Sequence, residues 1–259
     1  IPEKSTFYDM PAGYHMYEHE YYLDVMPPRR SDAIGCRKYP LWSKFMPEFQ
    51  AMDLSRQILE GTPYPIKALY GAGMNAKMFP DTQKMYRALK SLDFFVDTDL
   101  FLTDTAKYAD IVLPACTSYE RGEFKAYMGG YATFTKPVIK PLYESKSDVQ
   151  ILKELADVMN LDDPLLREGY EAEINYMIRD LSVTIDDMKA SDFPIHVPEA
   201  RDVVPGEFTK NGMNTASGKF EFYSNYIAEF KDMGLDPIPT WKGTLDDEGA
   251  DPKEYPLIL

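Results

Sequence analysis

The sequence is poor in cysteine, with only Cys36 and Cys116 among its 259 residues. The two lie far apart and form no C-x-x-C pair, which excludes an iron–sulfur cluster or a thiolate zinc site built within this chain. A disulfide between them is one alternative. We expect instead two ordinary thiols that are buried or half-buried.

Positive charge is also scarce. Lys and Arg number 28 against 42 Asp and Glu, giving a formal net charge of −14. A surface of this sign repels phosphate backbones, so nucleic acid is a poor candidate partner. The acidic residues are spread along the chain, with one cluster at Asp246-Asp247-Glu248, as expected of a solvated surface.

Long apolar runs are missing as well. No stretch of 18 apolar residues occurs, so we predict no membrane-spanning segment. The first residues, IPEKSTFYDMP, lack an initiator Met and the basic start and apolar core of a signal peptide. We therefore expect a segment excised from a longer polypeptide. Periplasm and cytoplasm both remain open as its compartment.

The chain contains enough apolar residues for a sizeable core, with 44% hydrophobic and 14% aromatic residues. Residues 1–47 are rich in Tyr, Met and Pro and show poor periodicity, which predicts an irregular arm. From Glu48 the apolar residues recur at helical spacing, and Gly61 with Pro63 is expected to end that helix.

A regular alternation of short elements follows. Apolar strands are expected at 66–70, 94–96 and 111–113. One helix is expected to begin after Asp81 as its N-cap, and another amphipathic helix to cover 149–159. This order predicts an α/β fold with a Rossmann-like, doubly wound and mainly parallel sheet that has helices on both faces.

The segments that flank this alternation are less regular. The Gly-rich stretch 122–130 is expected to be irregular, 170–179 to be helical, and 191–215 to be a long connector. A strand is expected at 219–223, because apolar and polar residues alternate there, and another to begin at 255.

The sequence therefore predicts four parts. These are an irregular N-terminal arm (1–47), a Rossmann-like dinucleotide-binding domain (48–165), a helical and connector extension (166–254) and the first residues of a further domain (255–259).

Ligands of an open parallel sheet bind beyond the carboxyl ends of its strands. The loop after Tyr70 contains Gly71 and Gly73, which let a ligand approach the backbone closely. The next strand ends in Asp97-Thr98-Asp99, whose hydroxyl and carboxylate groups suit a ribose or a guanine edge. A third loop follows the third strand. A G-x-G pair is also common in ordinary tight turns, and Ala76 stands where the third glycine of a full dinucleotide motif would be.

A second motif indicates different chemistry. His15-Met16-Tyr17-Glu18-His19 matches H-x-x-E-H, in which His15 and His19 would bind zinc and Glu18 would act as the base of a hydrolase. Pro11 and Gly13 disfavour the helix that this motif needs, and no third ligand is evident. The zinc hydrolase is therefore the least favoured hypothesis.

From Ile66 onward the chain resembles the molybdopterin oxidoreductases of the dimethyl sulfoxide reductase family. Six segments support the resemblance, and they stand in the family's order: LYGAGM (69–74), FFVDTDLFLTDTAKYADIVLPA (94–115), YERGE (119–123), SDVQIL (147–152), TASGKFEFYS (215–224) and YPLIL (255–259). The last two resemble the lead-in to the family's C-terminal barrel and the first strand of that barrel. Residues before Ile66 match nothing in the family.

The resemblance implies a bis(molybdopterin guanine dinucleotide) cofactor with molybdenum or tungsten, one guanosine arm of which rests on this domain. The backbone of Gly71, Ala72 and Gly73 would pass close to the cofactor. Thr98 and Asp99 fall where the family binds the nucleoside, and the Asp99 carboxylate would accept hydrogen bonds from guanine N–H or ribose hydroxyl groups. Ala72 and Gly73 replace an Asn common in this loop, which removes a side-chain contact.

Two further positions follow from the resemblance. Arg121 would offset the charge of the pyrophosphate, and Asp148 aligns with a second acid that contacts guanosine. Each assignment has a structural alternative. Thr98 and Asp99 would cap a turn, Arg121 would form a surface ion pair, and Asp148 would cap the helix that follows it.

Other parts of the family's enzymes are absent from this sequence. These are the N-terminal iron–sulfur cysteines, the segment that ligates the metal, the second dinucleotide-binding domain and most of the barrel. We therefore expect a fragment that binds cofactor without being catalytic alone. Its partners would be the rest of the same polypeptide and an electron-transfer subunit or iron–sulfur protein, in anaerobic respiration. The alternative is a non-catalytic α/β nucleotide-binding or interaction module.

Overall fold

The computed structural model of the protein describes residues 33–45, 50–127, 130–179, 181–197, 206–213, 215–241 and 253. The chain divides into two compact units, Ile1–Val203 and Val204–Leu259. Each unit is described by itself below. The motif His15–His19 and the strand expected at 255–259 lie outside the described residues.

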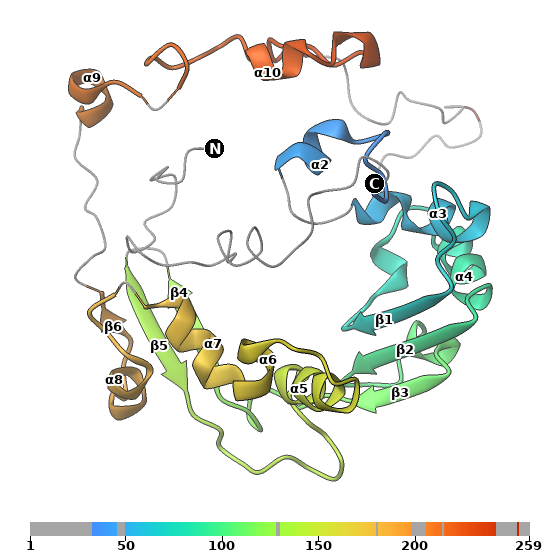
Figure 1. Ribbon diagram of the computed structural model, residues 1–259, viewed down its shortest axis with the longest axis vertical. Coiled ribbons are helices and arrows are strands. Elements are labelled where there is room, and N and C mark those ends of the chain that lie inside the picture. Colours follow the sequence, from blue (N-terminus) through green and yellow to red (C-terminus); the bar gives the residue numbers. More distant parts are fainter. Residues whose placement is uncertain are drawn as a thin grey trace. The chain divides into compact units, whose positions relative to one another are not determined.

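A three-stranded parallel sheet forms the first layer of the first unit. Its strands β1 (Ala68–Ala72), β2 (Phe94–Asp99) and β3 (Ile111–Pro114) stand in the order β1-β2-β3. Figure 1 shows the three arrows side by side and pointing the same way. The register sets Gly71 beside Asp97 and Asp99 beside Pro114. The expectation of an α/β protein with a parallel sheet is confirmed, with the first strand two residues later than expected.

Two helices and a short turn pack on this sheet. Helix α3 (Leu54–Glu60) follows the 3-10 turn η1 (Ala51–Asp53), and left-handed Gly61 ends it, as expected. Helix α4 (Thr82–Lys90) is capped by Asp81, whose carboxylate accepts a hydrogen bond of 3.0 Å from the Lys84 N–H. The core that these elements share consists of Ile34, Leu54, Ile58, Ala76, Met85, Ala88, Leu89 and Phe95.

The connections between the strands contain two further 3-10 turns. These are η2 (Ala76–Met78) after β1 and η3 (Ala106–Tyr108) after β2. The Thr105 hydroxyl accepts a hydrogen bond of 2.9 Å from the buried Ala76 N–H, and thereby links the two connections.

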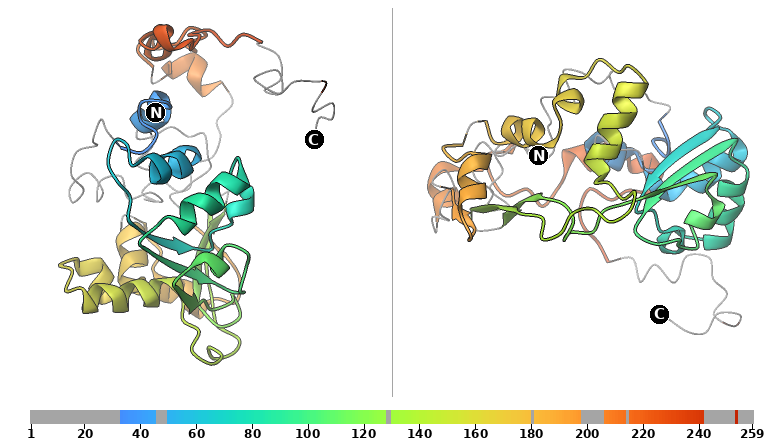
Figure 2. Two further views of the ribbon diagram at one scale, coloured as in Figure 1. Left: turned by 90° about the vertical axis from the view of Figure 1, so that its right-hand side faces the viewer. Right: turned by 90° about the horizontal axis from the view of Figure 1, so that it is seen from below.

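A second sheet lies where the sequence predicted irregular chain. Strands β4 (Glu123–Tyr127) and β5 (Tyr131–Thr135) pair antiparallel, and β6 (Ile195–His196) adds to the other edge of β5. The two sheets are seen in Figures 1 and 2. The predictions of an irregular 122–130 and of a connector from 191 are therefore wrong at these residues. Alternating side chains on both sides of Gly129-Gly130 favour a hairpin over a loop.

Four helices follow the β4–β5 hairpin in the described chain, before β6. They are α5 (Asp148–Val158), α6 (Pro164–Glu168), α7 (Tyr170–Met177) and α8 (Ile185–Ala190). Helices α5 and α7 confirm the two helices expected at 149–159 and 170–179. A second buried cluster consists of Ala132, Ile174, Ile178, Val183, Ile185, Met188 and Val197.

The remaining segments differ from expectation in two places. Helix α2 (Pro40–Phe45) falls within the arm expected to be irregular. In the second unit, which contains α9 (Glu207–Asn211), α10 (Asn225–Ala228) and the turn η4 (Lys231–Met233), residues 219–223 form no strand. Phe220 and Phe222 are 63% and 77% exposed, and no described segment pairs with them. Alternation there predicted a strand for which the described chain offers no ladder partner.

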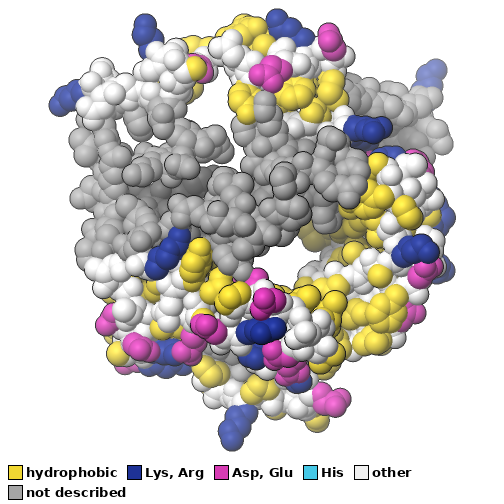
Figure 3. Space-filling model, in the orientation of Figure 1, with side chains coloured by type: hydrophobic (Ala, Val, Ile, Leu, Met, Phe, Trp, Pro, Cys, Tyr) yellow, Lys and Arg dark blue, Asp and Glu magenta, His cyan; other side chains and the backbone are white. Residues whose placement is uncertain are grey.

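The described part of the chain holds no helix long and apolar enough to cross a membrane. Cys36 and Cys116, half-buried and buried respectively, form no disulfide with each other, so the disulfide alternative is wrong. Acidic and basic side chains are interspersed on the face drawn in Figure 3. The domain bounds 1–47, 48–165, 166–254 and 255–259 stay predictions.

Candidate functional site

The end of β1 and the loop after it expose backbone to solvent. Ala72 and Gly73 are exposed, and a Cβ at Gly73 would meet no atom within 4 Å. Gly73 has a φ of +59°, and its N–H donates a hydrogen bond of 2.8 Å to the Thr98 carbonyl. Gly71 is buried, and a Cβ there would lie 3.0 Å from Asp97 Oδ1. The loop is thus fixed to β2 while Ala72 and Gly73 face outward.

The hydroxyl of Thr98, which was predicted to contact the nucleoside, is buried and hydrogen-bonded within the protein. Its side chain is 1% exposed, and its Oγ1 shares a hydrogen bond of 2.9 Å with the Tyr70 hydroxyl. Because this hydroxyl is buried, a nucleoside could contact it only if the chain around it moved. Tyr70, which the sequence reading did not single out, therefore helps to join the ends of β1 and β2.

Asp99 stands at the carboxyl end of β2 and is partly exposed. Its Oδ1 accepts a hydrogen bond of 2.6 Å from the Leu100 N–H, and its Oδ2 accepts a longer one of 3.4 Å from the Thr103 hydroxyl. Asp99 therefore caps the turn after β2, as its structural alternative predicted. A carboxylate has about four acceptor positions, so these two bonds leave capacity for a donor on a ligand.

Arg121 and Asp148 come together although 27 positions separate them. Arg121 Nη1 lies 2.8 Å from Asp148 Oδ2, and the same guanidinium binds Glu123 Oε1 through Nε at 2.9 Å and Nη2 at 2.8 Å. The hydrogen bond with Arg121 is the main reason that the pKa of Glu123 is lowered. Arg121 is thus engaged by two carboxylates in the described chain, as its structural alternative predicted.

Asp148 lies in the first turn of α5 but does not cap it. The cap is Ser147, whose hydroxyl accepts a hydrogen bond of 3.2 Å from the Gln150 N–H. The helix-cap alternative for Asp148 is therefore wrong. Its side chain is 40% exposed, and Oδ1 is not the atom that binds Arg121, so one carboxylate oxygen remains for another donor.

Backbone hydrogen bonds bring these elements to one edge. The Ala115 N–H donates to the Asp99 carbonyl at 3.1 Å, and the Lys146 N–H donates to the Pro114 carbonyl at 3.1 Å. Ala115 and Lys146 form a parallel bridge, so the chain just before α5 extends the sheet beyond β3. The carboxyl ends of β1, β2 and β3 and the start of α5 therefore lie along one edge, called here the carboxyl edge.

Two acidic residues of this region were not among the predicted cofactor-binding residues, although Asp97 was named with Thr98 and Asp99 at the end of its strand. Asp97 is fully buried, and neither of its carboxylate oxygens has a hydrogen-bond partner among the residues that the structure describes. Burial away from water, helped by the charge of Asp99, raises the pKa of Asp97 to about 6. The register that places Asp97 beside Gly71 is known only from the structure, so no signal in the sequence indicated that this acid lacks a donor.

Glu120 is the opposite case. Its carboxylate accepts hydrogen bonds from the Thr117 N–H at 2.7 Å, the Thr117 hydroxyl at 2.8 Å and the Leu142 N–H at 2.6 Å. These donors lower the pKa of Glu120 to about 2. It fastens the loop after β3 to the segment that leads into α5, and no sequence motif indicated that role.

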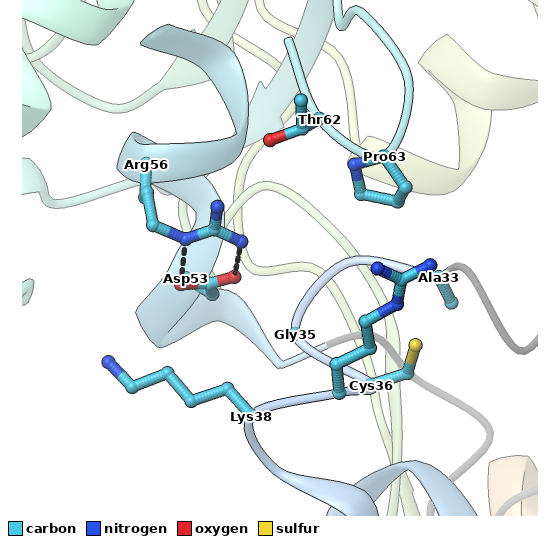
Figure 4. A pocket seen from close by; sticks show the side chains of 9 residues that line it. Ala33, Gly35, Cys36, Lys38, Asp53, Arg56, Thr62 and Pro63 are labelled. Atoms are coloured by element: carbon cyan, nitrogen blue, oxygen red, sulfur yellow. Dashed lines mark hydrogen bonds and ion pairs between the residues drawn. The ribbon is translucent and has the colours of Figure 1, made fainter. Parts of the chain in front are cut away.

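A cavity of about 240 Å³ lies apart from the predicted residues. Figure 4 shows Asp53 and Arg56 paired at its wall, with Arg56 Nε 2.9 Å from Asp53 Oδ1. The remaining lining residues are Ala33, Gly35, Cys36, Arg37, Lys38, Thr62 and Pro63. The acid of this cavity is already paired with a base, and none of its residues belongs to the carboxyl edge.

Comparison with known proteins identifies the class. A family model described as molybdopterin oxidoreductase matches residues 49–158, so the expectation that no residue before Ile66 matches the family is wrong for residues 49–65. The chain is 33% identical over 219 residues to the probable oxidoreductase YoaE of Bacillus subtilis. The alignment covers 81% of this chain and 30% of that protein. It is 32% identical over 203 residues to acetylene hydratase of Syntrophotalea acetylenica, and that alignment covers 76% of this chain and 27% of the hydratase. It is 31% identical to trimethylamine-N-oxide reductase of Haemophilus influenzae, and that alignment covers 76% of this chain and 27% of the reductase.

A solved structure agrees with these matches. Acetylene hydratase from Pelobacter acetylenicus aligns with a TM-score of 0.62 and 28% identity, over 79% of this chain and 28% of that one. The chain thus spans less than a third of the length of the relatives that it matches.

The protein is therefore related to molybdopterin enzymes through both sequence and fold. The family-model match and these relatives confirm the resemblance to the molybdopterin oxidoreductases of the dimethyl sulfoxide reductase family that was seen in the sequence. Members of this family use a molybdenum–molybdopterin cofactor.

Proposed function

We propose that this chain binds one guanosine arm of a bis(molybdopterin guanine dinucleotide) cofactor in a molybdenum or tungsten oxidoreductase. The observation that supports it is the carboxyl edge, where Asp99, Asp148 and the open backbone of Ala72-Gly73 lie along the ends of parallel strands. Guanosine offers N–H and hydroxyl donors, which match these carboxylate acceptors. The fold proposed for the matched domain is a Rossmann-like, doubly wound sheet with helices on both faces.

The charges of the edge fit the nucleoside better than the pyrophosphate. Asp99, Asp148, Glu123 and Asp97 are acidic, and the Arg121 guanidinium is already bound by two of them. An anionic pyrophosphate would compete with Asp148 and Glu123 for that cation. In this proposal Asp99 and Asp148 bind the donors of the nucleoside, and Arg121 holds Asp148 in position.

The chain is proposed to be inactive alone. In this cofactor the metal supplies the redox chemistry, and protein groups bind and orient it. The residues of this chain would bind the guanosine arm, while the rest of the same polypeptide supplies the metal ligand. Electrons would pass through an electron-transfer subunit or iron–sulfur protein, in anaerobic respiration. Nothing in the described residues favours the zinc hydrolase.

The test is made on the full-length parent protein, purified without oxygen. We expect molybdenum or tungsten together with two equivalents of guanosine monophosphate released by acid hydrolysis. Asp99→Asn and Asp148→Asn keep the side-chain shape and remove the charge. Each should lower the guanosine retained after gel filtration by on the order of tenfold, because a hydrogen bond to a charged group contributes about 1.5–3 kcal/mol.

The matched control is Asp93→Asn, just before the amino end of β2. Asp93 is 69% exposed and pairs only loosely with Lys67 at 3.6 Å, so guanosine content should not change. A parent protein free of metal and guanosine, made in a host that synthesises the cofactor, would leave the non-catalytic α/β module in its place.

A further inference from the structure

Asp97 has an environment that ordinary structural roles do not explain. It is a fully buried acid on the central strand of the parallel sheet, and both of its oxygens lack a hydrogen-bond partner in the described chain. Buried carboxylates are normally paired or hydrogen-bonded, because an ionised group without donors is strongly destabilising in a protein interior. A buried carboxyl without hydrogen-bond donors therefore indicates a specific role for Asp97.

The space around Asp97 depends on a glycine. Gly71 lies beside Asp97 across β1 and β2, and a Cβ built on it would lie 3.0 Å from Asp97 Oδ1. The same point is 3.3 Å from the Met74 Cβ and 3.4 Å from the Phe95 ring. The carboxyl therefore lies against the stretch Gly71–Met74, called here the glycine loop, which contains the exposed backbone of Ala72 and Gly73.

No positive charge in the described part of the chain compensates the carboxyl of Asp97. Asp99 shares its side of β2, since side chains alternate along a strand, and it is the one ionisable group whose charge acts on Asp97 appreciably. Gly71 and Met74 from β1 and its loop carry no charge, and Val112, the register partner on β3, is apolar. Every described neighbour thus favours the neutral carboxyl over the ionised one.

We propose that Asp97 is a positioning residue for the glycine loop: its neutral carboxyl packs beside Gly71 and keeps the loop closed, and its ionisation opens the loop. The ionised form can reach water or loop N–H groups only if the glycine loop moves away. The neutral form needs no such movement. Since burial raises the pKa of Asp97 to about 6, the change falls between mildly acidic and neutral conditions.

This inference extends the proposed function, because the glycine loop is part of the proposed nucleoside site. Loop opening would weaken the hold on a guanosine arm as pH rises. The loop movement itself needs no ligand, however. It can be measured in ligand-free protein, so its outcome is independent of whether the cofactor binds at this edge.

The experiment is amide hydrogen exchange of the ligand-free full chain between pH 5 and pH 8, corrected for intrinsic exchange rates. In the wild type, protection of the peptide 71–76 should fall, by at most about tenfold for each pH unit above the midpoint. In Asp97→Asn, which has the same shape and no titration, protection of this peptide should stay constant. Asp99→Asn should keep the fall but move its midpoint to lower pH, because the charge of Asp99 helps to raise the pKa of Asp97, and peptides of α5 should show no fall.

Constant protection of 71–76 in the wild type would overturn the proposal, as would an unchanged fall in Asp97→Asn. If Asp97→Asn does not fold, the carboxyl carbon of Asp97 is titrated by NMR in the wild type. Its midpoint must then coincide with that of the loop, and a difference of more than one pH unit would also overturn the proposal.

Discussion

Single acidic residues of the carboxyl edge differ in what surrounds their charge. Glu120 accepts hydrogen bonds from two backbone N–H groups and a hydroxyl, and Asp97 accepts none in the described chain. The pKa of Glu120 is accordingly lowered to about 2, whereas that of Asp97 is raised to about 6. Both are buried, so donors rather than depth decide the direction.

Glu120→Gln is expected to lower the Tm at pH 7, because the amide replaces an ionised acceptor of three short hydrogen bonds. The folded pKa is depressed, so the stability from the carboxylate is present above about 4.5 and is lost as pH falls towards 2. The Tm difference between variant and wild type should therefore narrow from pH 5 to pH 2.5. Calorimetry at both values checks it, and a difference that widens in acid would contradict the assignment.

Arg121→Ala is expected to destabilise the protein by about 1–2 kcal/mol, since it leaves Glu123 and Asp148 without their shared cation. Urea denaturation at pH 7 measures this change. The control is Lys153→Ala, which removes a surface pair with Asp157 at 2.9 Å and should cost less than about 0.5 kcal/mol. Equal effects of the two substitutions would show that the Arg121 pairs contribute no more than surface ion pairs.

Among the helices and strands, the sequence predicted the elements whose ends are fixed by neighbouring residues in the chain. Asp81 before α4 and Gly61 after α3 act as cap and stop through neighbouring backbone, so no distant partner was needed to foresee them. Strands depend on partners elsewhere in the chain. Residues 219–223 alternate without a described partner and form no strand, while β4 and β5 find each other and form one.

The candidate site shows the same division. The glycine loop and Asp99 follow from the rule that ligands meet the ends of parallel strands, so they could be predicted. The pairing of Arg121 with Asp148, the burial of Thr98 against Tyr70 and the isolation of Asp97 depend on three-dimensional neighbours. No spacing in the sequence encodes them.

Gly122→Ala tests the packing of the β4–β5 hairpin. A Cβ at this position would lie 2.5 Å from Cζ of Phe134 and 3.2 Å from the Thr135 carbonyl oxygen, so the ring or the strand must shift. We expect a loss of about 1–3 kcal/mol, as for other overpacked sites. In a Phe134→Leu background the same substitution should cost less. A double-mutant cycle measures the coupling, and additive effects would exclude this contact as the cause.

At the scale of the whole molecule, the first unit contains two separate buried clusters. One lies between the parallel sheet and α3 and α4, and the other between β5 and helices α7 and α8. The matched family model ends at residue 158, the last residue of α5, so it contains all of the first cluster except Ile34 and none of the helices of the second. The two clusters therefore need not have equal stability or unfold together.

Leu89→Ala and Ile174→Ala probe this division, because each residue is almost fully buried in its own cluster. Each should cost about 2–5 kcal/mol locally, as core truncations to alanine do. If the clusters unfold separately, Leu89→Ala should lower hydrogen-exchange protection in β1, β2 and α4 and leave α7 and α8 unchanged. Ile174→Ala should do the reverse. A uniform loss of protection in both variants would instead show that the two clusters unfold as one unit.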